Sequence, residues 1–282
     1  MKTLLTGLLL MLQLSAFAQA PADTAAAPAP ADSAKFSIKR SWQNLKQKDF
    51  SRESKLLFKS GIVITAVSGV GIATYHFGDE PMRDFMLENR SEVTHTISGY
   101  IEPLGRTKYM MPATGVLYVS GLALKNKNMQ RAALLTFFSL HVNDFVTHQL
   151  KDEFQRRRPN ATHQNHRFEW GEGGRHHASM PSSHTSTAFT VATSLATIYK
   201  DTKLVPPIAY GTATLVALSR IHDNVHWATD VLAGAAVGFV TSKTTYFLMH
   251  QSEKLLEKKG VNIYLVPAVG PQQAGLNAGI TF

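Results

Sequence analysis

Two histidines in the sequence have neighbours that suit proton transfer or nucleophilic attack. His226 lies in the string SRIHDNVHWATD, and Asp230 follows it four residues later. If both share a helical turn, the carboxylate accepts a hydrogen bond from one ring nitrogen and leaves the other directed outward. His184 ends the string Pro-Ser-Ser-His before an apolar stretch, where helix-start amides and an imidazole together suit an anion. The His226 and Asp230 spacing also occurs in ordinary surface contacts on helices. The Pro-Ser-Ser-His string also occurs as a capping turn.

Basic residues accompany both histidines. Lys151 is followed after six residues by Arg158 and Pro159 in KDEFQRRRP. Arg220 precedes His226 in SRIHDNVHWATD. Such cations suit the non-bridging oxygens of a phosphoryl group and stabilise its transition state without a metal. The string KDEFQRRRP by itself is also typical of an ordinary helix end, where basic side chains complement the helix dipole.

Taken in order, these motifs resemble a known family signature. Lys-x6-Arg-Pro, Pro-Ser-Ser-His and Ser-Arg-x5-His-x3-Asp are similar to the three-part signature of the PAP2 and vanadium haloperoxidase superfamily, and the resemblance covers roughly residues 56–250. Ser183 stands where many members carry glycine. We expect serine to be tolerated there because the backbone amide is the group that counts.

The resemblance implies a role for each matched residue. His226 would attack phosphorus as a neutral imidazole, held in its tautomer by Asp230, and form a phosphohistidine. His184 would protonate the leaving alkoxide and then activate the water that releases phosphate. The phosphate-binding residues implied by the resemblance are Lys151, Arg158, Ser182, Ser183 and Arg220.

No cofactor or metal is expected. Four further histidines, His163, His166, His176 and His177, lie between the first two motifs, but they show no paired spacing on a recognisable helix. The chain has no cysteine, which excludes thiolate zinc sites, disulfides and cysteine nucleophiles. We instead expect this segment to be a solvent-exposed loop through which substrate reaches the site, and we expect the loops 77–108 and 160–180 to set specificity.

The elements that must position these motifs are predicted to be helices. Apolar stretches too long for typical strands, and without period-two alternation, predict an all-α, six-helix bundle of the PAP2 and haloperoxidase type. The predicted helices cover residues 56–75, 109–124, 131–150, 185–199, 204–218 and 228–249. Gly234 and Gly238 form a pair of small residues that lets two helix backbones approach closely.

The regions outside this bundle have other compositions. Residues 1–20 have the form of a signal peptide that ends in a small-x-small cleavage site, and residues 21–55 form an Ala/Pro-rich spacer and a basic segment. The domain is expected over residues 56–250. The tail, residues 251–282, contains two short predicted strands around a turn.

The formal net charge of +9 favours anionic partners, and no nucleic-acid-binding pattern occurs. We therefore predict a metal-independent phosphatase of phosphate monoesters or diphosphates, whose partner is a phosphorylated lipid of the phosphatidate, undecaprenyl diphosphate or lipid A type, or a phosphorylated small molecule. The alternatives are a soluble periplasmic acid phosphatase of broad specificity, a vanadate-dependent haloperoxidase and a silent membrane scaffold.

The expected location is the periplasm. The third predicted helix contains Asp144 and other polar residues that disfavour a mid-membrane position. The bundle is therefore expected to be exported, packed mainly against itself, and at most partly embedded in or peripherally attached to a membrane, with its phosphate site reachable from the periplasm.

Overall fold

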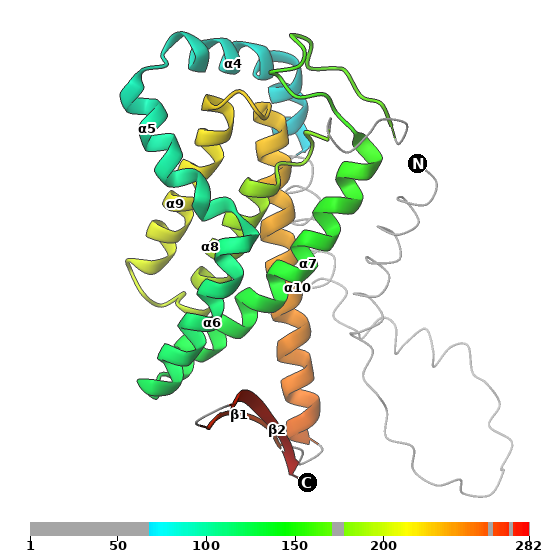
Figure 1. The fold of residues 1–282 in the computed structure, drawn as a ribbon. Coiled ribbons are helices and arrows are strands. Elements are labelled where there is room, and N and C mark those ends of the chain that lie inside the picture. Colours follow the sequence, from blue (N-terminus) through cyan, green and yellow to red (C-terminus); the bar gives the residue numbers. More distant parts are fainter. Residues whose placement is uncertain (1–67, 171–177, 259–261, 271–272, 282) are drawn as a thin grey trace, which may run out of the picture. The chain divides into compact units, whose positions relative to one another are not determined.

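Helices dominate the described chain, as expected for the all-α class. The computed structural model describes residues 68–170, 178–258, 262–270 and 273–281, all within the unit Gly61–Phe282 (Figure 1). Five predicted segments coincide, to within a few residues at most ends, with α6 (Thr107–Ala123), α7 (Lys127–Phe154), α8 (Ser183–Ile198), α9 (Val205–His222) and α10 (Ala228–Lys258). Of the first predicted segment, residues 68–75 are helical and the remainder lies outside the described residues.

The expectation of a loop over residues 77–108 was wrong. This stretch contains α4 (Asp79–Glu88), α5 (Glu92–Ile101) and the short 3-10 helix η1 (Glu102–Gly105). The start of α5 is specified locally, because the Ser91 hydroxyl accepts from the Thr94 amide and the Thr94 hydroxyl accepts from the Ser91 amide. These helices are short and carry charged residues, so a search for long apolar stretches does not detect them.

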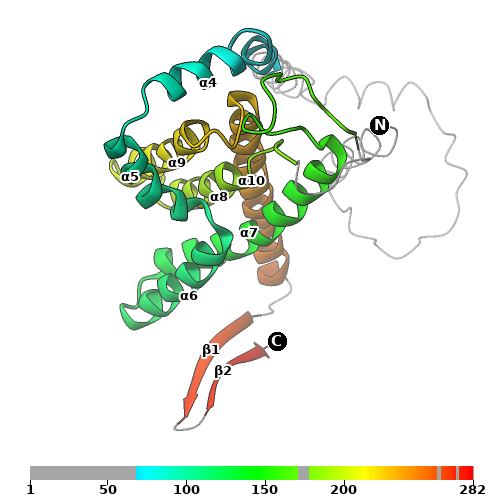
Figure 2. The same ribbon diagram turned by 45° about the horizontal axis from the view of Figure 1, so that its top comes forward.

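Close approach of α10 to α8 depends on two glycines. A Cβ at Gly234 would lie 2.6 Å from the Ser182 carbonyl oxygen, and a Cβ at Gly238 would overlap the Ser186 carbonyl oxygen. The predicted pair of small residues therefore does bring two helix backbones together. In Figure 2, α8 lies among α7, α9 and α10, and it contacts all three.

The interior between these helices is rich in small hydroxyl groups. The Ser186 hydroxyl lies 3.2 Å from Asn143 Nδ2 and 3.1 Å from Thr147 Oγ1, and Ser194 Oγ lies 2.9 Å from Ser242 Oγ. Large apolar side chains lie instead on the exposed helix faces, among them Val116, Val119, Phe138, Phe145, Phe239, Val240 and Leu248. This arrangement is the reverse of that in a typical water-soluble protein. Within the described residues, one helix, Ala228–Lys258, has the length and composition to cross a membrane, although core helices of soluble proteins also meet that criterion.

The two predicted tail strands form an antiparallel hairpin. The backbone of β1 (Asn262–Gly270) pairs with that of β2 (Gln273–Thr281), with Asn262 opposite Thr281 and Gly270 opposite Gln273.

Candidate active site

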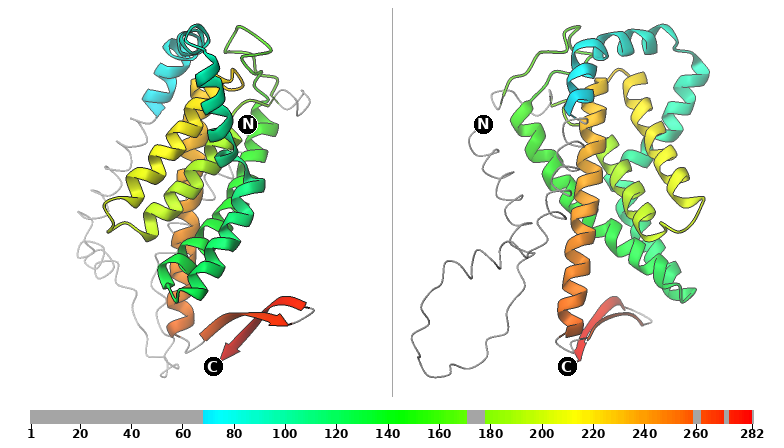
Figure 3. Two further views of the ribbon diagram at one scale, coloured as in Figure 1. Left: turned by 60° about the vertical axis from the view of Figure 1, so that its left-hand side comes forward. Right: turned by 180° about the vertical axis from the view of Figure 1, so that it is seen from behind.

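The three motifs meet at one end of the helices. The last residues of α7, the first residues of α8 and the turn between α9 and α10 lie together, at the top of Figures 1 and 3. The Lys151 ammonium donates to the Ala178 carbonyl oxygen at 2.8 Å, and Arg158 Nη1 donates to the Val225 carbonyl oxygen at 3.3 Å. These bonds join the first motif to the segments that contain the other two.

His226 and Asp230 are both buried, with 3% and 0% of their side chains exposed. His226 Nδ1 lies 3.7 Å from Asp230 Oδ2. The hydroxyl of Ser179 links them, because it donates to Asp230 Oδ2 at 2.5 Å and lies 3.3 Å from His226 Nδ1. The Trp227 amide donates to the same carboxylate oxygen at 2.9 Å. One ring nitrogen of His226 therefore faces a fixed acceptor group.

The electrostatic surroundings keep this pair as neutral imidazole and carboxylate. Burial, together with the charges of Lys151 and Arg158, lowers the pKa of His226 to about 3 against the opposing effect of Asp230. Burial alone would raise the pKa of Asp230, but contacts with His226 and Arg156 outweigh it and leave the pKa lowered. A neutral imidazole at pH 7 is the form that can act as a nucleophile.

Lys151 and Arg158 lie close enough to this pair to lower the pKa of His226, and Arg220 lies near Arg158 and Glu102. Lys151 is half-buried, and desolvation together with the positive charge of Arg158 lowers its pKa to about 7. The pKa of Arg158 is lowered by burial, and that of Arg220 is lowered by burial and, to a smaller extent, by the charge of Arg158. Arg220 is itself paired, because its Nη2 lies 2.5 Å from Asp223 Oδ2. Because the charge of Arg158 lowers the pKa of both Lys151 and Arg220, the three cations lie close enough to form a strong site for an anion.

His184 lies beside a carboxylate that the sequence analysis did not identify. His184 Nε2 is 2.5 Å from Glu102 Oε1, and Arg220 Nη1 is 3.6 Å from the same oxygen. Burial and the charge of Arg220 lower the pKa of His184 to about 4, against the opposing effect of Glu102. A close backbone approach allows this contact, because a Cβ at Gly105 would lie 2.8 Å from the His184 carbonyl oxygen.

Only one of the two serine amides expected to bind phosphate is available. The Ser182 amide donates to the Asp230 carbonyl oxygen at 3.0 Å, so the expectation of a phosphate contact from this amide was wrong. The Ser182 hydroxyl instead accepts from the Thr185 amide at 3.4 Å and caps α8. Ser183 occupies the first position of α8, where an amide has no intrahelical carbonyl to bind. Its amide thus remains for an anion.

The sequence of this region matches a known family. Residues 132–254, which contain all three motifs, match the PAP2 superfamily. The part of the chain that contains the motifs is therefore a PAP2 superfamily domain.

Individual relatives match the chain to different extents. A lipid A 1-phosphatase of Porphyromonas gingivalis is 42% identical over 71 residues, a match that spans 25% of this chain but only 16% of the relative. The crystal structure of a transmembrane PAP2 type phosphatidylglycerolphosphate phosphatase from Bacillus subtilis has the same fold. It covers 69% of this chain and 97% of its own, with a TM-score of 0.53 and 21% identity. The crystal structure of Aquifex aeolicus LpxE gives a TM-score of 0.48 at 20% identity, over 60% of this chain and 94% of its own.

Sequence reasoning missed four residues that contact the PAP2 motif residues. Glu102 and Asp79 lie in a stretch that we had expected to be a loop, and nothing near them in the sequence signals a contact with the motifs. Arg156 and Ser179 lie within or beside the quoted motif strings, so a local signal existed. It was not used because neither position belongs to the signature.

The described part of the chain offers no cluster of metal ligands. Across residues 68–170 and 178–258, no group of three or more His, Asp or Glu residues is arranged to hold a metal ion. His176 and His177 lie outside the described residues.

Proposed function

We propose that this chain is a metal-independent phosphatase that removes phosphate from lipid monoesters or diphosphates through a phosphohistidine intermediate. The observation that carries the proposal is the buried, neutral imidazole of His226, which faces the Asp230 carboxylate and lies among cations. The other groups at this end of the helices suit the remaining steps.

In the first step, the free ring nitrogen of His226 attacks phosphorus while Nδ1 stays directed at Asp230. The P–O bond to the lipid alkoxide breaks, and phosphorus is transferred to the imidazole. Lys151, Arg158 and Arg220 bind the non-bridging oxygens, and the Ser183 amide adds a directional donor. The attack places positive charge on the ring, which the Asp230 carboxylate stabilises.

His184 supplies the proton to the leaving alkoxide. Burial and the charge of Arg220 lower its pKa to about 4. A bound phosphoryl group neutralises Arg220 and so raises the pKa of His184 toward neutrality, which makes it a competent acid only when substrate is present. After the alkoxide leaves, neutral His184 activates the water that hydrolyses the phosphohistidine.

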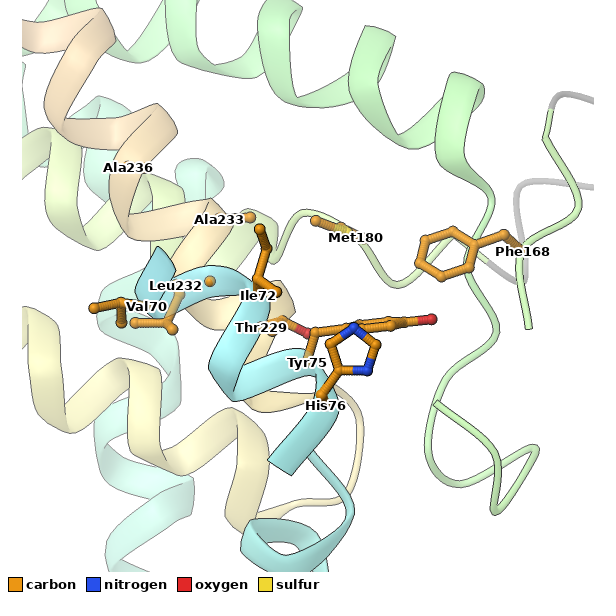
Figure 4. Close-up of a pocket in the computed structure, with 11 residues that line it drawn as sticks. Val70, Ile72, Tyr75, His76, Phe168, Met180, Thr229, Leu232, Ala233 and Ala236 are labelled. Carbon is orange, nitrogen blue, oxygen red and sulfur yellow. The ribbon is translucent and has the colours of Figure 1, made fainter. Parts of the chain in front are cut away.

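An apolar cavity next to the site favours a lipid over a soluble monoester. The cavity measures about 580 Å³ and lies between the helix over residues 68–77 and the start of α10 (Figure 4). Its wall includes Thr229, the neighbour of Asp230, and Met180, the residue before the second motif. Most of the other lining side chains are apolar, among them Val70, Ile72, Leu232, Ala233 and Ala236. An acyl chain fits this chemistry, because a cavity lined mainly by apolar groups gains most by excluding water.

The proposed location is an exported, membrane-associated one. The exposed apolar faces of the helices can bind lipid, which would hold the phosphate site next to lipid substrates. The signal peptide predicted over residues 1–20 lies outside the described residues.

A phosphate-release panel tests the proposed function. The purified full chain in detergent micelles is assayed with phosphatidate, undecaprenyl diphosphate, lipid A and soluble monoesters, with and without EDTA. We expect EDTA-insensitive release from at least one lipid at a kcat/KM that exceeds the best soluble monoester by at least about tenfold, which corresponds to roughly 1.4 kcal/mol of apolar contact.

The matched variants are His226→Ala and Asp230→Asn. The first should abolish turnover, whereas the second should leave a residual rate because it damages orientation rather than bond formation. Faster hydrolysis of soluble monoesters would support the alternative of a broad-specificity acid phosphatase. Bromide oxidation in the presence of vanadate would support a haloperoxidase.

A further inference from the structure

Arg156 is fully buried beside the candidate nucleophile, with 0% of its side chain exposed. Its Nη1 donates to Asp230 Oδ1 and to Thr229 Oγ1, both at 2.7 Å, and its Nη2 donates to Asp79 Oδ2 at 2.6 Å. Nε donates to the Asn165 carbonyl oxygen at 2.8 Å. The guanidinium thus binds two carboxylates at once, and only one of them belongs to the family signature.

Asp79 completes this network from the first residue of α4. Besides Arg156, it accepts from the Thr229 amide at 2.8 Å and from the Thr229 hydroxyl at 2.6 Å. Both of its oxygens are therefore bonded, although only 1% of the residue is exposed. The carboxylate also lies next to the first turn of α10. Backbone amides there have no acceptor within the helix, so they can donate to the carboxylate.

Three aromatic rings hold the guanidinium in place. The Cζ atom of Arg156 lies 5.5 Å from the ring centre of Tyr75, 5.3 Å from that of Phe168 and 5.4 Å from that of Trp227. Packing on these faces, together with the hydrogen bonds, restricts the orientation of the guanidinium plane.

The orientation of Arg156 determines the orientation of the carboxylate beside the nucleophile. Asp230 Oδ1 is held by Arg156, while Oδ2 accepts from Ser179 and from the Trp227 amide. With both oxygens bonded, the carboxylate cannot rotate away from His226. A buried ion pair contributes little net stability compared with apolar packing, so stability alone gives little reason for three charged side chains at this position.

We propose that Arg156 and Asp79 are positioning residues for the reaction, which hold the Asp230 carboxylate ionised and directed at His226 so that its imidazole keeps the tautomer with the proton on Nδ1. This inference rests on the proposed role of His226 as nucleophile. Neither residue touches the substrate. Their effect reaches the phosphoryl group only through the imidazole.

The first test measures the tautomer of the His226 imidazole directly. Full-length protein labelled with ¹⁵N-histidine is studied by NMR at pH 7 in detergent micelles, and the His226 signals are assigned by their loss in His226→Gln. The wild type should show a single tautomer with the proton on Nδ1. Arg156→Gln should show a mixture, because the freed carboxylate samples other orientations. The matched control is Arg157→Gln, since Arg157 is half exposed and pairs with Glu169 at the surface.

The second test is kinetic. Arg156→Gln should lower kcat by about 10- to 100-fold, as expected for a group that orients a catalytic residue. KM should change less than about threefold, because the phosphate-binding cations remain. Circular dichroism and the thermal midpoint report whether the fold is intact. If Arg156→Gln does not fold, Thr229→Val replaces it, since valine keeps the side-chain shape and removes the hydroxyl between Arg156 and Asp79.

Each outcome is decisive. A folded Arg156→Gln with a single Nδ1–H tautomer, or with kcat within twofold of wild type, would overturn the proposal. If Thr229→Val has to replace Arg156→Gln, an unchanged His226 tautomer together with an unchanged kcat in Thr229→Val would also overturn the proposal. A wild type that releases no phosphate from any substrate would defeat the proposed function, while the NMR comparison would still decide whether Arg156 positions His226.

Discussion

At the scale of single residues, each candidate catalytic histidine has a carboxylate neighbour, and the two pairs differ in exposure. His226 and Asp230 are almost completely buried, whereas His184 keeps 28% of its side chain exposed beside Glu102. A buried neutral imidazole suits attack on phosphorus, and a partly exposed one suits exchange of protons with water and with a leaving group. The difference in environment supports the assignment of different tasks to two identical side chains.

Glu102→Gln tests the acid role of His184. The Glu102 carboxylate raises the pKa of His184, so its removal lowers that pKa. A general acid works only in its protonated form, so activity is lost as pH rises through its pKa. The high-pH limb of kcat should therefore move to lower pH, by at least about half a unit.

The pH dependence of kcat between pH 5 and 9 is the measurement, with Glu92→Gln on the exposed start of α5 as control. A limb that stays in place, or moves to higher pH, would exclude Glu102 as a partner of the acid.

At the scale of elements, the site depends on how closely α10 approaches α8. The turn that contains His226 leads into α10, and the start of α8 donates its Ser182 amide to the Asp230 carbonyl oxygen. The glycines at 234 and 238 permit this contact because they have no side chain between the two backbones. The second motif, at the start of α8, and the third motif, at the start of α10, are thereby held next to each other.

Gly238→Ala tests this packing. A Cβ there overlaps the Ser186 carbonyl oxygen and lies 2.9 Å from the Thr190 amide nitrogen, so the helices must separate. We expect a loss of about 1–3 kcal/mol in the free energy of unfolding, as for overpacking generally, together with reduced kcat.

The matched control is Gly211→Ala in α9, where an added Cβ meets nothing within 4 Å. It should be neutral, or stabilise the protein by up to about 1 kcal/mol through helix propensity. Thermal unfolding in detergent measures both variants. Equal midpoints for the two would mean that the close approach of α8 and α10 is not required.

At the scale of the whole molecule, hydroxyl groups lie between the helices and large apolar side chains lie on their exposed faces. In water such exposed faces cost free energy, which lipid contact removes. The end of the helices that holds the candidate site differs from these faces, because it consists of charged residues and polar loops. The proposed membrane association, with the candidate phosphate site near the lipid surface, accounts for both features.

Cell fractionation tests this association. We expect the chain to remain with membranes after a carbonate wash and to leave them in mild detergent. The chain has no cysteine, so Gln164→Cys, in the exposed segment after the first motif, gives a single reactive thiol. An impermeant thiol reagent should label it from the periplasm. Labelling only after the inner membrane is broken would place the site in the cytoplasm, and release by carbonate would exclude embedding through the apolar faces.

The sequence alone determined the helices that carry the motifs and the residue types of the site. Long apolar stretches identify α6 to α10, and the motif strings place His226 and Asp230 four residues apart, although His226 lies in the turn before α10 rather than in the same helical turn as Asp230. Such features are local, so no knowledge of tertiary contacts is needed to find them. The family signature extended this local information to Lys151, Arg158 and His184.

Only the tertiary structure decided which distant groups contact these residues. Asp79 bonds to the Thr229 amide across 150 positions of sequence, and Glu102 meets His184 because η1 and α8 approach closely. It also decided that the Ser182 amide binds the Asp230 carbonyl oxygen. The physical reason is that a hydrogen bond or ion pair between distant segments depends on how helices pack, and neither residue type nor spacing along the chain specifies that geometry.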